Sequence, residues 1–153
     1  MKNSNTSKIT DILHARLTDM LMVYLQSKQL HWNVTGAHFK PLHDLFDAVA
    51  AFAQASADEI AERAVVLGAP ALSGRRHLDQ SKLEELPPNT TSGSDCVAAM
   101  TRLLTTVSES VRADINSTAE MGDPISSDIL TGIGGELEKT LWMVRSHKDL
   151  NSR

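Results

Sequence analysis

The sequence has little of what several classes of protein require. It contains one cysteine, Cys96, so a fold held by internal disulfides is excluded, and this usage is typical of a reducing compartment such as the cytoplasm. Aromatic residues make up only 4% of the 153 residues, whereas leucine and alanine are abundant, which favours helices over a sheet. No apolar run is long enough to span a membrane, and the polar first eight residues carry no secretion signal. We therefore expect a cytoplasmic, single-domain protein without membrane partners.

Positive charge is also scarce. The chain has 15 Lys and Arg against 19 Asp and Glu, which gives a formal net charge of −4 and a pI of about 5.8. A surface of this sign repels nucleic-acid phosphates, so DNA binding needs a local basic segment. Near the N-terminus the candidates are Lys2 and Lys8, whose weak effects would have to add up over the copies in an oligomer. We expect direct DNA binding, and association with the nucleoid, to be weak.

A third absence concerns the usual signature of metal sites inside helical bundles. Di-iron proteins of this kind carry Glu-x-x-His motifs that point into the bundle of one subunit. In this sequence no glutamate has a histidine three residues later. A di-iron site inside a single subunit is therefore not expected, and the bundle interior can be an ordinary apolar core.

Apolar residues recur at intervals of three and four along most of the chain, which predicts amphipathic helices. The stretch from 69 to 92 holds several prolines and glycines and is long enough to cross a bundle from end to end. The sequence thus predicts an all-α four-helix bundle over residues 9–148, between a flexible tail at 1–8 and a short tail at 149–153. The expected elements are a helix capped by Thr6 or Ser7 and ending near Gly36, a second from Pro41 to Gly68, a short helix near residues 75–80, a third from Ser94 to the break at Gly122, and a fourth capped by Ser126.

Two histidines and three carboxylates have spacings that suit a metal site. His43 and Asp47 are four residues apart on the second predicted helix, and so are Asp58 and Glu62, so each pair lies on one face about one turn apart. Asp47 and Asp58 are eleven residues apart, so the two pairs share a face but lie roughly 16 Å apart along it. Because a short loop makes the first two helices antiparallel, His31 is expected level with His43.

One ion cannot bridge the two pairs within a chain, but two chains can bring them together. If two copies of the second helix pack antiparallel about a two-fold axis, His43 and Asp47 of one chain meet Asp58 and Glu62 of the other. Alanines around the crossing point at Phe52 allow a close approach. A pair of polar residues four apart is usually a solvated helix face, yet both pairs on one face of an otherwise apolar helix favour a metal site. Imidazole and carboxylate donors suit iron, manganese or zinc rather than calcium.

These residues also form a recognisable pattern. It consists of His31-Trp32, Val34, Gly36, Phe39, Leu42-His43, Asp47, Asp58, the run from Ile60 to Arg63 and Leu67-Gly68, together with Asp123, Asp128, Glu138-Lys139 and Trp142-Met143 near the end. The pattern resembles the Dps family, small ferritin-like proteins named as DNA-binding proteins from starved cells. The resemblance implies a ferritin-like fold and a ferroxidase site in which His31, His43 and Asp47 of one subunit join Asp58 and Glu62 of its two-fold mate.

The resemblance also implies an activity and an assembly. Ferrous iron is oxidised, usually by hydrogen peroxide, and the ferric product is stored as a mineral inside a hollow dodecamer built from two-fold dimers. Removal of ferrous iron and peroxide together prevents hydroxyl-radical formation, so DNA is protected from oxidative damage without needing to be bound.

Further roles follow from the same resemblance. Trp32, next to His31, is suggested as an electron donor to stray oxidants, and packing explains its presence equally well. Asp128, Asp123 and Glu120 are suggested as a cation-entry pore at a three-fold axis, although Asp128 in a first helical turn also complements the helix dipole. Pro124 stands where some relatives carry another acidic residue, so such a pore would hold fewer charges.

Two other functions remain open at this point. The first is a non-specific DNA-binding and compacting protein with a secondary metal site, which the scarcity of basic residues argues against. The second is a structural role for zinc or another ion, which would fill the site between subunits and hold the dimer together.

Overall fold

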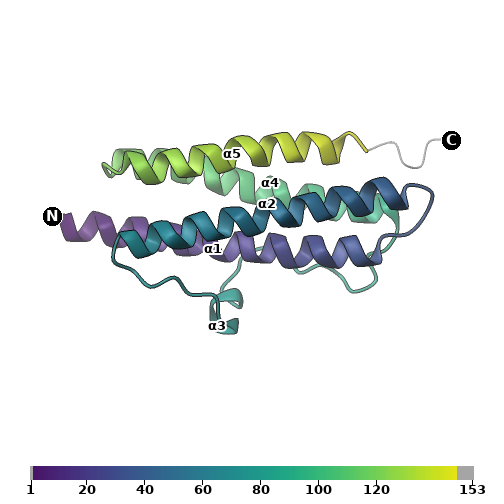
Figure 1. Cartoon of the computed structure of the whole chain (residues 1–153), viewed down its shortest axis with the longest axis horizontal. Helices are drawn as coiled ribbons and strands as arrows, with labels where there is room; N and C mark the ends of the chain where they lie inside the picture. Colours follow the sequence, from purple (N-terminus) through teal and green to yellow (C-terminus); the bar gives the residue numbers. More distant parts are fainter. Residues whose placement is uncertain (1, 148–153) are drawn as a thin grey trace.

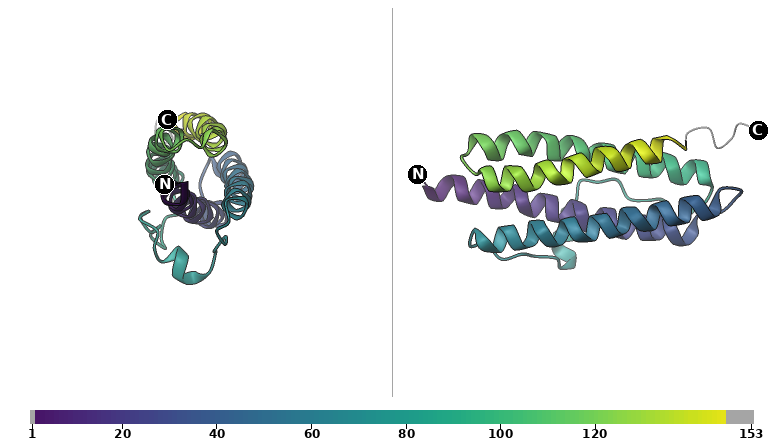
Figure 2. Two further views of the ribbon diagram at one scale, coloured as in Figure 1. Left: turned by 90° about the vertical axis from the view of Figure 1, so that its left-hand side faces the viewer. Right: turned by 45° about the horizontal axis from the view of Figure 1, so that its top comes forward.

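Four long helices and one short helix make up the described part of the chain (Figure 1). The computed structural model describes residues 2–147, and the side chains of residues 4–147. The helices are α1 (Lys2–Asn33), α2 (Phe39–Val66), α3 (Arg75–Leu78), α4 (Gly93–Glu120) and α5 (Pro124–Arg145). Seen end-on, the four long helices surround a common axis, and the connection that carries α3 runs outside them (Figure 2). The predicted all-α four-helix bundle with a long crossover is confirmed.

The crossover returns the chain to the end of the bundle where α1 stops and α2 starts. At that end the backbone N–H of Thr35 donates to the carbonyl of Thr91 at 2.8 Å, so the α1–α2 turn is fastened to the start of α4. At the other end, Asn5 Nδ2 donates to the carbonyl of Met121 at 3.3 Å, which joins the start of α1 to the α4–α5 turn. Helices α2 and α4 therefore run in the same direction, and α1 and α5 run in the opposite one.

The core is formed where the apolar stripes of the four long helices meet. Leu13, Phe46, Leu104 and Leu137, one from each helix, are fully buried, and burial of such side chains contributes about 1.5–3 kcal/mol each. Cys96 also belongs to this core, and burial raises the pKa of its thiol to about 11. No helix in the described part of the chain is long and apolar enough to cross a membrane.

Two of the helices end at a glycine with a positive φ angle. Gly68 follows α2 with φ +90°, and Gly122 follows α4 with φ +85°, a region that glycine enters without steric cost. Beyond them, the N–H of Ala69 donates to the carbonyl of Ala64, and the N–H of Asp123 donates to the carbonyl of Thr118. These bonds satisfy carbonyls that the last helical turns leave free. The predicted stops at Gly68 and Gly122 therefore hold.

The start of the chain differs from the expectation. Residues 2–8, expected as a flexible tail, form the first turns of α1, so Thr6 and Ser7 lie inside the helix instead of capping it. The bond from Asn5 to the α4–α5 turn gives this segment a tertiary partner that the local sequence does not reveal. The tail expected at 149–153 lies outside the described residues.

The cap of the last helix also differs. Asp123, and not Ser126, is the N-cap of α5: its side chain accepts from the backbone N–H of Ser126 at 3.1 Å, and Pro124 takes the first helical position. Ser126 is fully buried in the first turn. The helix thus begins three residues earlier than a cap at Ser126 implies.

Candidate metal centre

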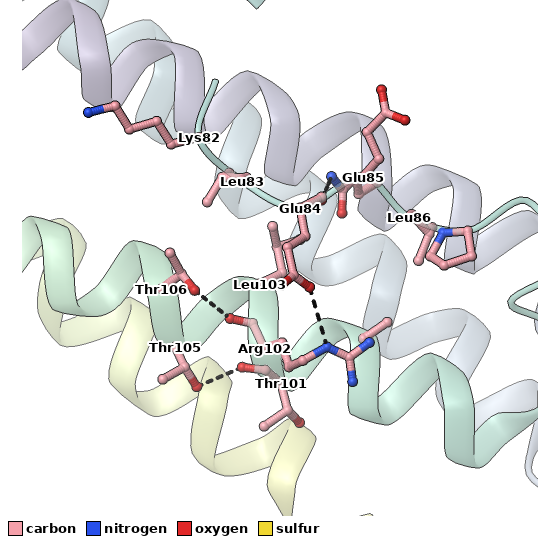
Figure 3. A pocket seen from close by; sticks show the side chains of 13 residues that line it. Lys82, Leu83, Glu84, Glu85, Leu86, Thr101, Arg102, Leu103, Thr105 and Thr106 are labelled. Carbon is pink, nitrogen blue, oxygen red and sulfur yellow. Dashed lines mark hydrogen bonds and ion pairs between the residues drawn. The ribbon is translucent and has the colours of Figure 1, made fainter. Parts of the chain in front are cut away.

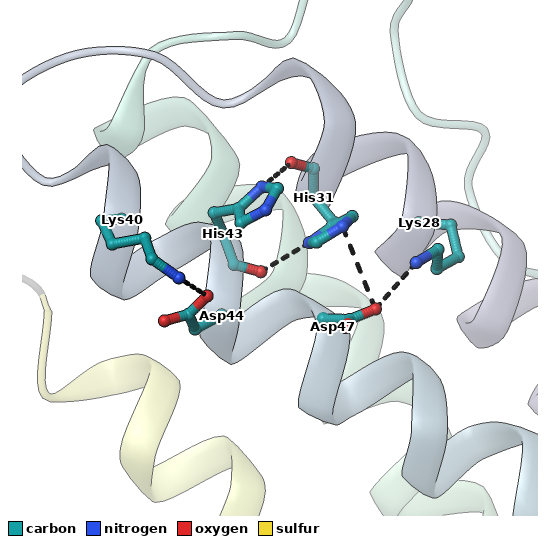
Figure 4. A network of polar contacts seen from close by, with 6 residues as sticks. All are labelled: Lys28, His31, Lys40, His43, Asp44 and Asp47. Carbon is teal, nitrogen blue, oxygen red and sulfur yellow. Dashed lines mark hydrogen bonds and ion pairs between the residues drawn. The ribbon is translucent and has the colours of Figure 1, made fainter.

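The two site histidines lie face to face between α1 and α2 (Figure 4). The rings of His31 and His43 are stacked, with centroids 3.7 Å apart and an interplanar angle of 20°. Phe39 lies on α2 with its ring centroid 5.0 Å from that of His43. The short turn between the helices, in which Gly36 adopts φ +107°, makes this pairing of residues twelve apart in sequence geometrically accessible. The predicted meeting of His31 and His43 is confirmed.

Each histidine is held by the backbone of the other. Nδ1 of His31 lies 2.7 Å from the carbonyl oxygen of His43, and Nδ1 of His43 lies 2.7 Å from the carbonyl oxygen of His31. A carbonyl can only accept, so both Nδ1 atoms carry the hydrogen. In the neutral rings the lone pairs are therefore on the two Nε2 atoms. Such backbone bonds fix the tautomer and orientation of metal-binding histidines.

Asp47 lies one turn beyond His43 and completes this half of the site. Its Oδ1 is 4.0 Å from Nε2 of His31, a separation that one first-row metal ion with bonds of about 2.0–2.2 Å to each atom can bridge. Lys28 donates to the same Oδ1 at 2.7 Å. This hydrogen bond, helped by the positive charge of Lys28, outweighs the opposing effect of desolvation and lowers the pKa of the Asp47 carboxyl.

Lys28 was not among the predicted site residues, although the sequence carried a signal for it. It lies three residues before His31, and this spacing places two side chains on the same helix face. Its Nζ also lies 5.7 Å from the ring centroid of Trp32, a residue that is 67% exposed. Trp32 therefore borders the site at its surface and is not a core residue.

Asp58 and Glu62 lie apart from the two histidines and Asp47, as the spacing of the two donor pairs along α2 predicts. Both are exposed on α2, on a stripe of the helix that also holds Asp47, Ala51 and Ala55, all exposed. Within residues 4–147, no group of three or more His, Cys, Asp or Glu side chains is arranged to hold a metal ion. One chain therefore presents two incomplete donor sets on one surface, with small side chains between them.

A groove runs beside this alanine-rich stripe. It has a volume of about 760 Å³ and is walled by α2, by α1 and by the segment after α2. Its lining includes Ala51, Ala55 and Asp58 of α2, Leu21 and Tyr24 of α1, and Leu72. Leu72 is 40% exposed. The surface beside Asp58 is thus hollow and largely apolar.

Comparison with known proteins identifies the family. Residues 10–152 match the family model described as ferritin-like domain. A DNA protection during starvation protein from Agrobacterium fabrum is 32% identical over 142 residues, which cover 92% of this chain and 88% of the relative. The chain belongs to the Dps family of ferritin-like proteins.

Solved structures of Dps proteins agree with this assignment over nearly the full chain. Dps from Mycobacterium smegmatis superposes with a TM-score of 0.90 at 28% identity, covering 94% of this chain and 88% of that one. Dps from Microbacterium arborescens, solved in a high iron form, superposes with a TM-score of 0.88 at 28% identity, covering 94% of this chain and 93% of that one.

The three acidic residues suggested for a Dps-type cation pore lie in different environments. Glu120 and Asp128 are exposed, near the end of α4 and the start of α5. Asp123 is engaged inside the subunit: both of its oxygens accept bonds from Ser126, and Arg63 of α2 donates to Oδ1 at 2.8 Å. The side chains of Arg63 and Asp123 are each 11% exposed. Asp123 therefore has a structural role within the subunit, and the pore remains a prediction for all three residues.

Replacement of Asp123 by alanine is expected to lower the free energy of unfolding by about 3 kcal/mol at pH 7, because it leaves Arg63 without its partner and removes the cap of α5. Burial acts to raise the pKa of Asp123, but the bonds from Ser126 and Arg63 outweigh it and the pKa is lowered. The stabilisation is therefore present above the unfolded pKa near 3.8 and is lost as the pH falls through the lower folded value.

Urea unfolding of wild type and Asp123→Ala at pH 7 and in acid measures this difference. The matched control is Asp128→Ala, an exposed carboxylate on the same helix, whose effect should stay within about 0.5 kcal/mol. Equal stability of wild type and Asp123→Ala at pH 7 would show that the bonds of Asp123 contribute nothing net.

The basic residues suggested for DNA binding lie on a helix and not on a free arm. Lys2 is in the first turn of α1, and Lys8 is exposed on the same helix. In the described part of the chain, the N-terminal segment is therefore not an extended basic arm. Nothing in this arrangement favours DNA compaction over metal chemistry.

Another hollow lies between the crossover and α4 (Figure 3). It has a volume of about 390 Å³ and is lined mainly by residues 82–87 and 101–106. Arg102 and Glu84 form an ion pair of 3.8 Å across it, and both side chains are well exposed. Gln26 of α1 donates to the carbonyl of Glu84 at 2.9 Å. These contacts hold the crossover on the bundle, and they bring no set of metal-binding side chains together.

Proposed function

We propose that two copies of this chain pack their α2 helices antiparallel and oxidise ferrous iron at two equivalent sites between them. The observation that supports this is the exposed stripe of α2, which carries donors at both ends and alanines in the middle. A two-fold axis through the alanines brings the donors at opposite ends together. Each site then combines His31, His43 and Asp47 of one subunit with Asp58 and Glu62 of its mate.

The donor set suits the oxidation of iron. The two Nε2 atoms are good donors to ferrous iron, and three carboxylates stabilise the more highly charged ferric product. The ammonium group of Lys28 balances the negative charge of Asp47. A ferrous ion that binds Asp47 then takes the place of this ammonium group. With hydrogen peroxide, two ferrous ions each lose one electron, and peroxide with two protons gives two waters. The same donors also suit zinc or manganese, which should compete with ferrous iron.

The consequence for the cell follows from this chemistry. Consumption of ferrous iron and peroxide together removes both reactants of hydroxyl-radical formation, which protects DNA without requiring contact. We propose that the ferric product is stored as a mineral in a hollow dodecamer of these dimers, with Asp128, Asp123 and Glu120 near the route of entry for cations. The protein would act in the cytoplasm.

The test is to mix metal-free protein anaerobically with ferrous iron, add peroxide or air in separate experiments, and follow ferric absorbance. We expect oxidation by peroxide to be much faster than oxidation by air and faster than in buffer alone. Rates equal to those in buffer with both oxidants would contradict the proposed activity. A gel-shift assay at low and moderate salt tests the DNA-compacting alternative, and strong retardation at moderate salt would favour it.

A further inference from the structure

A second group of charged residues lies where α1 packs against α4, fifteen residues before His31 along α1. Arg16 of α1 lies between two carboxylates: its Nη2 is 3.2 Å from Oδ2 of Asp19, and its Nε is 3.4 Å from Oδ2 of Asp114 on α4. The side chains of Arg16, Asp19 and Asp114 are 13%, 9% and 19% exposed. The proposed iron chemistry has no use for this buried cluster.

The charges of the cluster do not balance. When both carboxylates are ionised, one guanidinium faces two negative charges, and a net charge of one unit is buried. The hydrogen bonding of Arg16 is also incomplete, since its buried Nε and Nη1 have no hydrogen-bond partner among the residues that the structure describes. Burial of an uncompensated charge is costly, and the usual relief is that the group takes up a proton.

Among the described residues, Arg16 alone forms an ion pair with Asp19 or Asp114. The hollow of about 510 Å³ beside the cluster is lined by Asp11 and His14 of α1 and by His77 and Lys82 of the crossover. His14 is bound to the carbonyl of Pro70, and Lys82 is exposed. On the α4 side the lining residues are the uncharged Thr106 and Ser110, and Arg112 of α4 is paired with Glu138.

We propose that one of the two carboxylates, Asp19 or Asp114, keeps its proton at a pH above that at which exposed aspartates lose theirs, and that this proton strengthens the α1–α4 junction. The cluster is then a pH-sensitive contact between α1 and α4, separate from the proposed metal site. Its proton cancels the buried excess charge and leaves one carboxylate paired with Arg16.

The direction of the effect agrees with the electrostatics of each group. Burial raises the pKa of Asp19, and Asp114 adds to the rise while Arg16 opposes it; burial likewise raises the pKa of Asp114 against the opposing effect of Arg16. A raised folded pKa contributes stability that is fully present below the unfolded pKa and is lost as the pH rises through the folded value. The cluster therefore acts in the opposite sense to Asp123.

The test compares urea unfolding of wild type and Asp114→Asn between pH 8 and pH 4, at fixed protein concentration. The amide imitates the protonated acid, so the free energy of unfolding of the variant relative to that of wild type should be highest at pH 8. This difference should decrease as the pH falls. Each unit by which the folded pKa is raised changes the relative unfolding equilibrium constant by up to about tenfold. Any constant packing cost of the amide cancels because only the change with pH is used. Asp11→Asn, an exposed aspartate of α1 beside the same hollow, is the control and should follow wild type.

A second measurement does not depend on the variant being stable. Infrared spectra of folded wild type in mildly acidic solution should show the carbonyl band of a protonated carboxylic acid that Asp11→Asn retains and that Asp19→Asn or Asp114→Asn lacks. An unfolding difference that is constant with pH, or a wild type without this band until its exposed carboxylates titrate, would overturn the proposal.

Discussion

Replacement of His31 and His43 together by alanine is expected to reduce peroxide-driven oxidation of ferrous iron by about a hundredfold or more, to the rate of iron in buffer. The variant loses both Nε2 donors of the proposed site. Even changes in residues that only orient metal ligands cost about 10–100-fold, so loss of two donors should cost at least as much. Stopped-flow absorbance of the ferric product, after anaerobic loading with ferrous iron, measures the rate.

The matched control for the double variant is His38→Ala. His38 lies in the same turn between α1 and α2, is exposed, and makes no side-chain capping bond to α2. It should leave the rate unchanged. The double variant also loses the two bonds of 2.7 Å between the helices, so its helical content and oligomeric state must be checked against wild type. A folded, assembled double variant that oxidises iron as fast as wild type would remove these histidines from the site.

Replacement of Ala55 by glutamate is expected to abolish the same activity, although all five proposed ligands remain. Ala55 is exposed and lies on α2 between the two donor pairs, in the middle of the proposed contact. At a two-fold interface one substitution introduces two carboxylates, whose burial between packed helices is unfavourable. The separated chain keeps two incomplete donor sets, so it should neither assemble nor oxidise iron rapidly. Light scattering and the stopped-flow assay measure the two effects.

An exposed alanine on another helix provides the control for this charge. Ala98 lies on α4 and is exposed, so Ala98→Glu adds the same charge without touching the α2 stripe. It should leave the α2 dimer and the iron site intact. If Ala55→Glu stayed assembled and fully active, α2 would not be the interface.

The parts of this structure that the sequence predicted are those encoded by local periodicity. Apolar spacing gave four helices and a crossover, glycine stops gave the ends at Gly68 and Gly122, and the short turn gave the meeting of His31 and His43. The spacing of eleven residues between Asp47 and Asp58 was enough to predict that one chain holds two separate donor pairs. Each of these depends on geometry that repeats along a helix.

The parts that the sequence did not predict depend on contacts between distant segments. The helical start of α1 is tied to Met121, and the cap at Asp123 is supported by Arg63, a residue sixty positions earlier. The reciprocal bonds of the histidines run to backbone carbonyls, which no residue pattern records. The excess charge around Arg16 appears only when α1 and α4 are brought together, because Asp114 lies far from Asp19 in sequence.

The most direct test of the account is to mix two inactive variants. His31→Ala/His43→Ala lacks one half of each site, and Asp58→Ala/Glu62→Ala lacks the other half. Co-expression of equal amounts of the two chains pairs them at random and creates mixed dimers in which one of the two sites has every ligand. If the site lies between subunits, random pairing should restore peroxide-driven oxidation to about one quarter of the wild-type rate, since half of the dimers are mixed and each has one intact site. If all five residues acted within one chain, the mixture would remain as inactive as its parents.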